Sequence, residues 1–409
     1  MEFIKKIENL EFITNFKRKL RKKDYKNSTY ISKEMAELFY QIIRTSIEEK
    51  NIVYQAELIL LVAYLGKIFI AIDPVQFCIG NTIKRILHII RDEINESKEE
   101  DKTDLEIKQE ILAEKLKEVT KNFKGLKNFD FGEADKENNS QKEQKDEDED
   151  NESESGSEKT STQKLYELQK MKSNKPISEK NKNNILKNIE DLILEIDNIN
   201  DNIKELKEIN ELICDGDEII TSNHSQQVAE ILIENAKTKK FKVFVAESAP
   251  LLDGRIQAEI LSQKGINTTI FNDDDIFSLM TKMPKVKVLL GARAILVNGG
   301  LITYGGSYNI CLSAHMFSIP VIIAGGSTKL TPMHSFKHDL YNEHLSPDLI
   351  FGKNVKYKLV ISNIQFNNPA FDYVPPNLIT MYATNIGIIN PNYLYRLLDD
   401  MYDKEDYEI

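Results

Sequence analysis

Apolar residues recur at helical spacing through the first third of the chain. They repeat every three or four residues in the stretches FIKKIENLEFITNF, SKEMAELFYQIIRTSI, YQAELILLVAYLGKIFIAI and IGNTIKRILHIIRDEI. Such spacing gives a helix one apolar side, which it buries against its neighbours. Ser32 is expected to cap the second helix, and Asp73 before Pro74 to end the third, because the residue before a proline disfavours helical backbone. The pattern predicts an all-helical N-terminal domain over residues 1–127.

A second helical region follows much later in the chain. Between 183 and 213 the apolar positions again step by three and four residues, at Ile185, Ile189, Leu192, Ile196, Ile199, Ile203 and Leu206. A stripe of this kind seals a helical bundle or pairs with another helix. We predict one long connecting helix within 173–215 that completes the helical domain.

From about residue 216 the periodicity changes. Short apolar runs (DEIITS, KVFVAES, NTTIFN, KVLLG, AILVN, PVIIAG) alternate with amphipathic stretches (SQQVAEILIENAKT, GRIQAEILSQKG, DDDIFSLMTKM, SYNICLSAHMFS). Alternation of strand and helix indicates parallel β-α-β units. We therefore predict an α/β protein in which the helical domain precedes a Rossmann-like, mostly parallel, doubly wound sheet over 216–409. Ligands of such sheets bind beyond the carboxyl ends of the strands.

The stretch between the two helical regions has a different composition. Residues 133–163 contain no Val, Ile, Leu, Phe, Met or Tyr, and hold twelve acidic residues against four lysines. Ordering such a segment costs backbone entropy with no apolar burial to offset it. We predict a disordered acidic insertion over 128–172, which supplies most of the net charge of −11. An acidic tail for a basic partner, or a set of phosphorylation sites, is the alternative interpretation.

Charge and cysteine content argue for a cytosolic protein that does not bind nucleic acid directly. Outside the acidic stretch the charges nearly balance, and the basic run KRKLRKK at 17–23 is interpreted as a solvated helix end. Cys78, Cys214 and Cys311 form no close pair and are expected to be buried apolar residues in a reducing compartment. The longest apolar run, LILLVAYLG, is short for a bilayer span, so no membrane partner is expected.

Two glycine pairs form a candidate ligand site. Asn298-Gly299-Gly300 follows a predicted strand, and Gly305-Gly306 precedes a predicted helix, where free amides attract an anion. Neither GxxxxGK[ST] nor GxGxxG after the first strand is present. The spacing therefore leaves two interpretations open, an anion site and a pair of tight turns.

Other residues that could bind a metal ion or act in catalysis are given structural roles. His334 and His338 have the i, i+4 spacing that places two side chains on one helical face, but HExxH is absent, and zinc needs a third ligand and a shaped pocket. These two histidines and His344 are therefore expected to be solvated. Asp273 is expected to cap a helix, with Asp274 and Asp275 at its positive end. Cys311 falls among apolar helix positions and is expected in the core. We predict neither a metal nor a cofactor.

The segment FDYVPPNLIT (371–380) is unusual. Pro375 and Pro376 hold the backbone extended, so that Phe371 and Tyr373 are presented rigidly. Aromatic residues beside prolines suit an interface anchor, and packing within the chain is an equal alternative.

Several segments carry a resemblance to a known family. FDYVPPNLIT, NIG (385–387), YLYRLL (393–398), VAESAP (245–250) and DPVQFCIGNTIKRILHIIRDE (73–93) are similar to the regulatory subunits of eukaryotic translation initiation factor 2B, and most of all to the beta-type subunits. This family is related to sugar-phosphate aldose–ketose isomerases. The resemblance implies dimerisation through the α/β domain, with interface candidates Phe371, Tyr373, Pro375, Pro376, Tyr393 and Tyr395.

The resemblance also implies that the isomerase chemistry is lost. Those isomerases use a cysteine and an aspartate as an acid/base pair, and the matching positions here are Asn223 in TSNH and Arg293 in GARAI. The lysine of their NKIGT motif is Tyr304 in TYGGS. An amide cannot shuttle a proton, and an arginine stays protonated. We expect a vestigial crevice formed by Asn223, Glu247, Arg293, Asn298, Gly299, Gly305 and Gly306.

By resemblance, the function is that of a non-catalytic regulatory subunit in the guanine nucleotide exchange factor for translation initiation factor 2. The implied partners are a delta subunit for dimerisation, the alpha, gamma and epsilon subunits, and initiation factor 2 itself as substrate. Such a subunit helps to assemble the regulatory core and to sense the phosphorylated substrate. The alternative is a ligand-sensing or isomerase-like sugar-phosphate-binding protein of the same superfamily.

Overall fold

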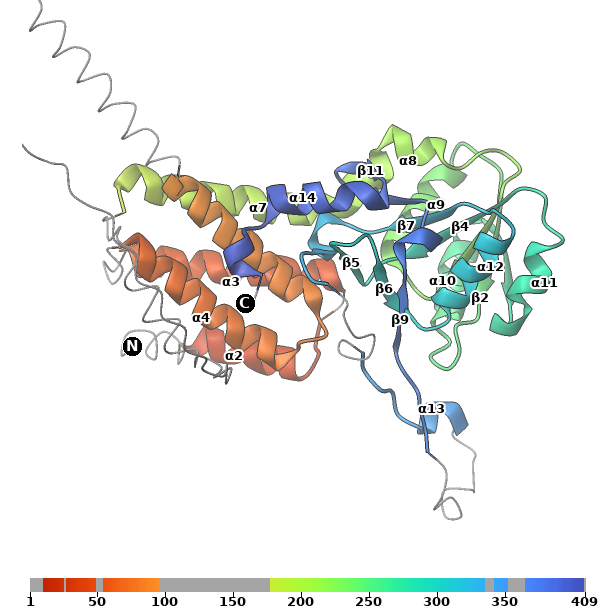
Figure 1. The fold of residues 1–409 in the computed structure, drawn as a ribbon, viewed down its shortest axis with the longest axis horizontal. Helices are drawn as coiled ribbons and strands as arrows, with labels where there is room; N and C mark the ends of the chain where they lie inside the picture. Colours follow the sequence, from red (N-terminus) through yellow and green to blue (C-terminus); the bar gives the residue numbers. More distant parts are fainter. Residues whose placement is uncertain are drawn as a thin grey trace, which may run out of the picture. The chain divides into compact units, whose positions relative to one another are not determined.

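The computed structural model describes residues 10–25, 27–48, 54–95, 177–334, 342–351 and 365–407 (Figure 1). The described parts up to Asp92 and after Pro176 form one compact unit. Its N-terminal helices are α2 (Glu11–Arg21), α3 (Ser28–Glu48), α4 (Gln55–Ile72) and a further helical stretch over 77–95. Helix α4 ends before Asp73, as predicted. The predicted acidic insertion at 128–172 lies outside the described residues.

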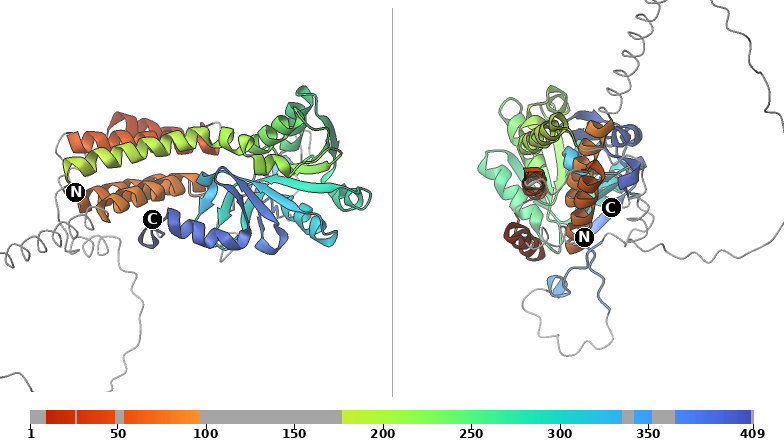
Figure 2. Two further views of the ribbon diagram at one scale, coloured as in Figure 1. Left: turned by 90° about the horizontal axis from the view of Figure 1, so that it is seen from above. Right: turned by 90° about the vertical axis from the view of Figure 1, so that its left-hand side faces the viewer.

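The helices meet through large apolar side chains. The ring of Phe69 on α4 contacts those of Phe16 and Phe39 edge-on, at centroid distances of 5.6 and 5.9 Å. Among the described helices, α4 is long and apolar enough by length and composition to cross a membrane. Several of its side chains, Phe69 among them, are buried within the chain. Helix α7 (Glu179–Glu205) packs along α3 and leads toward the sheet (Figure 2).

The predicted long connecting helix is broken. Helix α7 ends at Glu205, Leu206 takes an extended backbone (ψ 117°), and the short helix α8 (Lys207–Glu211) follows. Ile209 and Ile213 are then buried beside Leu289 of the sheet. A straight helix would carry these side chains past the sheet, so tertiary packing overrides the uninterrupted apolar stripe.

Ser32 does not cap a helix. Helix α3 begins at Ser28, and the Asn27 side chain caps it by accepting a 2.7 Å hydrogen bond from the Tyr30 N–H. Ser32 is buried inside the helix, where its hydroxyl donates to the Ser28 carbonyl at 3.0 Å. A serine one turn into a helix can bond the carbonyl four residues earlier, which the sequence pattern does not distinguish from capping.

The main sheet has the predicted architecture. Its strand order is β11-β10-β7-β4-β1-β2-β3, with every neighbouring pair parallel except β10 and β11. The strands are β1 (Glu218–Ser222), β2 (Lys242–Ala246), β3 (Asn267–Phe271), β4 (Val286–Gly291), β7 (Val321–Ala324), β10 (Met381–Thr384) and β11 (Gly387–Ile389). The six parallel strands run in the order of a dinucleotide-binding fold, which confirms a Rossmann-like domain. The proposed boundary at 216 stays a prediction.

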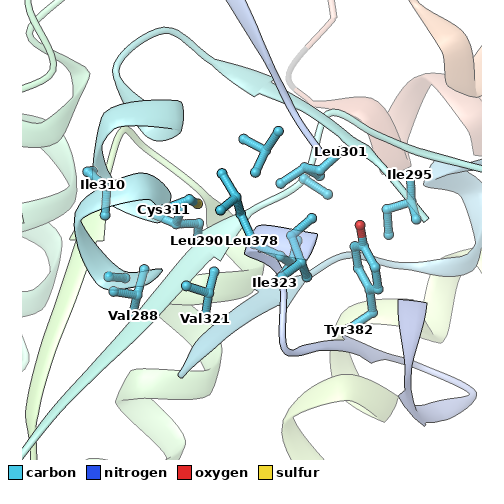
Figure 3. Close-up of a cluster of buried hydrophobic side chains, with 14 of the residues drawn as sticks. Val288, Leu290, Ile295, Leu301, Ile310, Cys311, Val321, Ile323, Leu378 and Tyr382 are labelled. Atoms are coloured by element: carbon cyan, nitrogen blue, oxygen red, sulfur yellow. The ribbon is translucent and has the colours of Figure 1, made fainter. Parts of the chain in front are cut away.

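Helices cover this sheet. They are α9 (Gln226–Ala236), α10 (Asp253–Gln263), α11 (Ile276–Met280), α12 (Ser307–Met316) and α14 (Leu394–Met401), with the short α13 (Asp348–Phe351) in a later loop. In Figure 3, Ile310 and Cys311 of α12 lie beside Val288 and Leu290 of β4. Cys311 is therefore a core residue, as predicted, and burial raises the pKa of its thiol to about 12.

A second sheet was not predicted. Its order is β8-β5-β6-β9, formed by β5 (Ala294–Leu296), β6 (Leu301–Tyr304), β8 (Leu330–Thr331) and β9 (Phe371–Val374). The run AILVN was expected in the parallel sheet, but only Ala292 and Arg293 separate β4 from β5. A parallel crossover needs about a dozen residues, so the chain turns into a separate sheet instead.

Asn298 and Gly299 form the hairpin turn between β5 and β6. The Leu296 N–H donates to the Gly300 carbonyl at 2.8 Å, and Gly299 has φ +78°. Asn-Gly suits such a turn, because its residues tolerate positive φ. For this glycine pair the structure confirms the tight-turn interpretation.

Candidate functional site

A cavity of about 470 Å³ opens at the point where the strand order reverses. Strands β1 and β4 are neighbours there, and their following loops lead in opposite directions, which makes this the usual ligand position in open α/β sheets. Residues after β1 and β4 line it together with residues of α3 and of the 77–95 helix. Its lining side chains include Tyr25, Cys78, Asn223, His224, Gln227, Arg293, Tyr304 and Lys329.

Arg293 presents an incompletely satisfied cation to this cavity. Its guanidinium lies over the Phe371 ring, 4.9 Å from the ring centre. Its Nε is buried without a hydrogen-bond partner among the described residues. A buried donor that lacks an acceptor is costly, so Arg293 would gain from an anionic or carbonyl acceptor in the cavity.

Lys329 is a second cation at the same cavity. Only 7 % of the residue is exposed, and its Nζ donates to Gln227 Oε1 at 2.8 Å. Within the described parts of the chain, no carboxylate pairs with it. Burial, assisted by the positive charge of Arg293, lowers the pKa of Lys329 to about 8. The ammonium is therefore still largely protonated at neutral pH.

Asn223 is held rigidly in the thiol position expected from the isomerase resemblance. It has φ +55°, is buried, and its N–H donates to Ser248 Oγ at 2.8 Å. Asp273 fixes the neighbouring loop by accepting from the Ser248 and Ala249 N–H groups at 2.9 and 2.7 Å. The predicted helix-capping role of Asp273 is therefore wrong, because both carboxylate oxygens serve the loop after β2 rather than their own helix.

Two groups from the helical part complete the cavity wall. Burial raises the pKa of the Cys78 thiol to about 11, so the thiol stays neutral. The Tyr25 hydroxyl donates to Asp73 at 2.7 Å, and burial together with this bond raises its pKa. Neither group is ionised at neutral pH, and the charged groups of the cavity side are Arg293 and Lys329.

The amides that follow the second glycine pair already have an anionic partner within the chain. Gly306, with φ +90°, precedes α12, and the Tyr308 N–H donates to Asp372 Oδ2 at 3.1 Å. Burial raises the pKa of Asp372, while hydrogen bonds from the Tyr308 and Gly306 amides oppose that rise. The chain thus supplies its own carboxylate at the helix N-terminus, where a phosphate would otherwise fit.

Only two of the seven residues expected to form the crevice line the cavity. Asn223 and Arg293 line the cavity, whereas Glu247, Asn298, Gly299, Gly305 and Gly306 are not among its lining residues. Glu247 accepts from Arg255 Nε at 2.8 Å on the surface. Asn298 instead donates to the Tyr373 hydroxyl at 3.0 Å.

The residues expected at the interface differ in their exposure. Phe371 is 7 % exposed and packs inside this chain with Tyr304. Tyr393 and Tyr395 are 52 % and 57 % exposed. Tyr373, Pro375 and Pro376 are partly exposed. A role of Phe371 as a surface anchor does not fit this burial, and the interface as such stays a prediction.

The possible metal ligands and the three cysteines are placed as follows in the structure. Among the described residues, no group of three or more His, Cys, Asp or Glu side chains could hold a metal ion. His338 lies outside the described residues. Cys78 and Cys311 are buried, but Cys214 is exposed, contrary to expectation. Cys214 lies in the turn before β1, where its N–H donates to Asp217 at 2.7 Å.

Sequence reasoning missed Lys329, Gln227 and Asp372. Lys329 follows the expected strand end Gly325-Gly326 within the mostly apolar run PVIIAGGSTKL. A single lysine in such a run signals a buried cation, and that signal was present. Gln227 and Asp372 come from distant parts of the chain, and their roles depend on tertiary structure.

The sequence is similar to that of known proteins over most of its length. Residues 26–391 match the initiation factor 2 subunit family. Translation initiation factor eIF2B subunit beta of Dictyostelium discoideum is 30% identical over 391 residues, covering 95% of this chain and 94% of that protein. The subunit of the same name from Schizosaccharomyces pombe is 37% identical over 224 residues, 54% of this chain and 56% of that protein.

Solved structures show the same fold. Crystal structures of eIF2B beta and of the tetrameric eIF2B-beta2-delta2 complex, both from Chaetomium thermophilum, match with TM-scores of 0.61 and 0.58 at 18% and 19% identity. The matches cover 100% and 95% of this chain and 97% and 94% of those chains. A ribose 1,5-bisphosphate isomerase of Methanocaldococcus jannaschii is 30% identical over 207 residues, 49% of this chain and 65% of the isomerase.

Proposed function

The chain belongs to the initiation factor 2 subunit family, and we propose that it acts as a non-catalytic, beta-type regulatory subunit of the guanine nucleotide exchange factor for translation initiation factor 2. The observation that carries this proposal is the extent of the likeness to a beta subunit, which spans 95% of this chain and 94% of the relative. A likeness of that length includes both the helical part and the α/β part, so it concerns the whole role of the chain.

The contents of the cavity support a role without catalysis. By the resemblance, Asn223 and Arg293 occupy the positions of the isomerases' acid/base pair, and neither side chain transfers a proton near neutral pH. Cys78, the cysteine that lines the cavity, has a pKa raised to about 11 by burial, so it is a poor nucleophile. Proton transfer by a positioned group contributes about 10²- to 10⁴-fold in rate, and neither residue of the expected pair supplies it.

The same proposal names the partners and the compartment. One matching structure is a beta2-delta2 complex, and delta and alpha subunits are among the relatives. Both observations support pairing with a delta chain next to an alpha chain. Gamma and epsilon subunits would then carry the exchange activity, and initiation factor 2 would be the substrate whose phosphorylation is sensed. Such an assembly works in the cytosol.

Co-expression with the delta-type subunit of the same organism tests the proposal. A tag on the delta chain should retain this chain in a one-to-one ratio, measured by native mass spectrometry. In an exchange assay with all five subunits, omission of this chain should abolish most of the inhibition by phosphorylated initiation factor 2. A tagged α/β protein of another family is the control. If this chain is stable but does not bind the delta-type subunit, the proposal is contradicted.

A second candidate function rests on Lys329 and Arg293. Among the residues that the structure describes, neither cation has a carboxylate partner, and two such cations at one cavity favour a phosphate-bearing ligand, bound without turnover. Inorganic phosphate or ribose 5-phosphate should raise the unfolding temperature, and Lys329→Met should weaken binding by about 10- to 100-fold through loss of a charge-assisted hydrogen bond. Because the pKa of Lys329 is about 8, affinity should fall between pH 7 and pH 9.

The exposed Lys404 provides the matched control, because Lys404→Met removes one positive charge from a residue that does not line the cavity. Binding that survives Lys329→Met would place the ligand elsewhere. Isomerisation of the sugar phosphate, followed by NMR, would instead indicate an enzyme.

A further inference from the structure

Lys329 is a buried lysine whose nitrogen lacks a counter-charge. It ends the 3-10 turn Ser327–Lys329 after β7, is 7 % exposed and lines the cavity. Its Nζ donates to one neutral acceptor, Gln227 Oε1, at 2.8 Å. No Asp or Glu is among the described residues that line the cavity. Buried cations are usually paired with an anion, so the environment of this nitrogen needs an explanation.

Two further buried N–H groups at this cavity lack an acceptor. Gln227 is 4 % exposed, and its Nε2 has no hydrogen-bond partner among the described residues, although its Oε1 accepts from Lys329. The Nε of Arg293 is in the same state, and the positive charge of Arg293 acts on Lys329. A buried donor without an acceptor is costly. An anion with two oxygens next to the Lys329 nitrogen would satisfy both donors.

The nitrogen of Lys329 is also more nucleophilic than that of a solvated lysine. Burial, assisted by the positive charge of Arg293, lowers its pKa to about 8. At pH 7 about one chain in ten then carries the neutral amine, on the order of a hundred-fold more than for an exposed lysine. Only the neutral amine has an electron pair that can attack an electrophilic carbon.

We propose that Lys329 is a site of reversible carbamylation by carbon dioxide. The nitrogen electron pair forms a bond to the carbon of CO₂, and one C=O π pair moves onto oxygen. A proton leaves the nitrogen for solvent water, so that the product is the anion Lys–NH–COO⁻. The inference goes beyond the regulatory role and does not depend on it, and it needs no phosphate ligand.

A carbamate satisfies the groups that the cavity leaves without partners. Its remaining N–H keeps the bond to Gln227 Oε1, and the oxygen on the same side accepts from Gln227 Nε2, as in a pair of amides. The second oxygen is an acceptor for Arg293 Nε, and the guanidinium charge stabilises the new anion. The three added heavy atoms are small beside a cavity of about 470 Å³. Two uncompensated cations thereby become one ion pair.

The amount of carbamate should depend on pH through Lys329 itself. The titratable groups that line the cavity with it are Tyr25, Cys78, His224, Arg293 and Tyr304. Arg293 stays protonated, and burial raises the pKa of the Tyr25 hydroxyl and that of the Cys78 thiol, the latter to about 11. At a fixed CO₂ pressure that leaves most chains unmodified, the carbamate should therefore rise by about 10-fold or more between pH 7 and pH 9, as the amine loses its proton.

Carbon NMR and chemical trapping test the proposal on the full chain. The protein is equilibrated with ¹³C-labelled CO₂ and bicarbonate at pH 8, and triethyloxonium then converts any carbamate into a stable ethyl ester. We expect one carbamate resonance, absent from Lys329→Arg, and the ester on the peptide that contains Lys329. Arg293→Met should lower the modified fraction by about 10-fold or more, the effect of losing a charge-assisted hydrogen bond.

Lys84 is the matched control within the same chain. It is 2 % exposed, and burial lowers its pKa to about 8 as well. Its Nζ donates to the Tyr407 carbonyl at 3.0 Å, the charge of Asp406 acts on it, and it does not line the cavity. We therefore expect no ester on Lys84. An unmodified Lys329, or equal modification of the two lysines, overturns the proposal, and trapping in the wild-type chain gives this result whether or not a variant folds.

Inorganic phosphate separates this proposal from the second candidate function. Phosphate that binds Lys329 and Arg293 should lower the carbamate signal as its concentration rises. A carbamate that forms on Lys329 regardless of phosphate would contradict the phosphate ligand and leave the carbamylation site standing.

Discussion

Replacing Glu195 with alanine is expected to lower the free energy of unfolding by about 3 kcal/mol, since one partner of a largely buried ion pair is then missing. Glu195 on α7 accepts from Arg85 Nη1 and Nη2 at 3.0 and 2.8 Å. It also accepts from Ser327 Oγ at 2.9 Å. One carboxylate therefore joins two helices to the loop after β7, and its removal leaves the Arg85 guanidinium without its counter-charge.

Chemical denaturation of the isolated chain measures this effect. Asp201→Ala is the control, because Asp201 also lies on α7 but forms an exposed pair with Lys204 that is worth about 0.5 kcal/mol or less. Burial raises the pKa of Glu195, but the hydrogen bonds and charge of Arg85 outweigh it and hold the pKa below its ordinary value. The contribution should thus be complete above the unfolded-state pKa and disappear as the pH falls through the lowered one. Equal stability of the two variants would contradict this account.

Tyr402→Ala is expected to cost about 3–5 kcal/mol, the usual range for removing a large aromatic side chain from a core. Tyr402 is 1 % exposed, and its hydroxyl donates to the Leu330 carbonyl at 2.8 Å. It belongs to the same core cluster as Leu394 and Leu398. The segment that follows α14 is therefore part of the core rather than a loose tail.

Two further variants separate the contributions to this effect. Tyr402→Phe keeps the ring and loses the hydrogen bond, so it should cost about 1–2 kcal/mol. Tyr395→Ala, at a residue that is 57 % exposed on α14, should change the stability of the isolated chain by about 0.5 kcal/mol or less. Thermal and urea unfolding of the three variants provide the comparison, and a Tyr402→Ala chain as stable as Tyr395→Ala would refute the packing described here.

The fold class could be predicted because its signals are local. Short apolar strands alternating with amphipathic helices leave few topologies besides a parallel, doubly wound sheet. The second sheet could not be predicted in the same way, because β5 resembles a parallel strand in composition. Its separation depends on the two-residue link Ala292–Arg293 and on the pairing of β6 with the distant β9. Long-range pairing of this kind leaves no periodic signal.

The candidate site was predicted in position but only partly in its residues. Asn223 and Arg293 follow strands that meet at the reversal of the strand order, so their neighbourhood followed from the topology. Lys329 contributes through burial, which the sequence only hints at. Asp273 and Ser32 have side chains whose partners are set by tertiary contacts, and local rules assigned them caps that they do not form. For Phe371 the sequence left an interface anchor and packing within the chain open, and its ring packs with that of Tyr304.

The position of Asp372 has a consequence for how the chain can respond to metabolites. Its carboxylate is attached to β9 and contacts the amides at the start of α12, so it acts as a tethered ligand. A tethered group is present at a high effective concentration whatever the solution contains. Free phosphate in the cell therefore competes poorly for this end of α12. Helix α12 therefore keeps its anionic partner, and with it its orientation, through changes in metabolite supply.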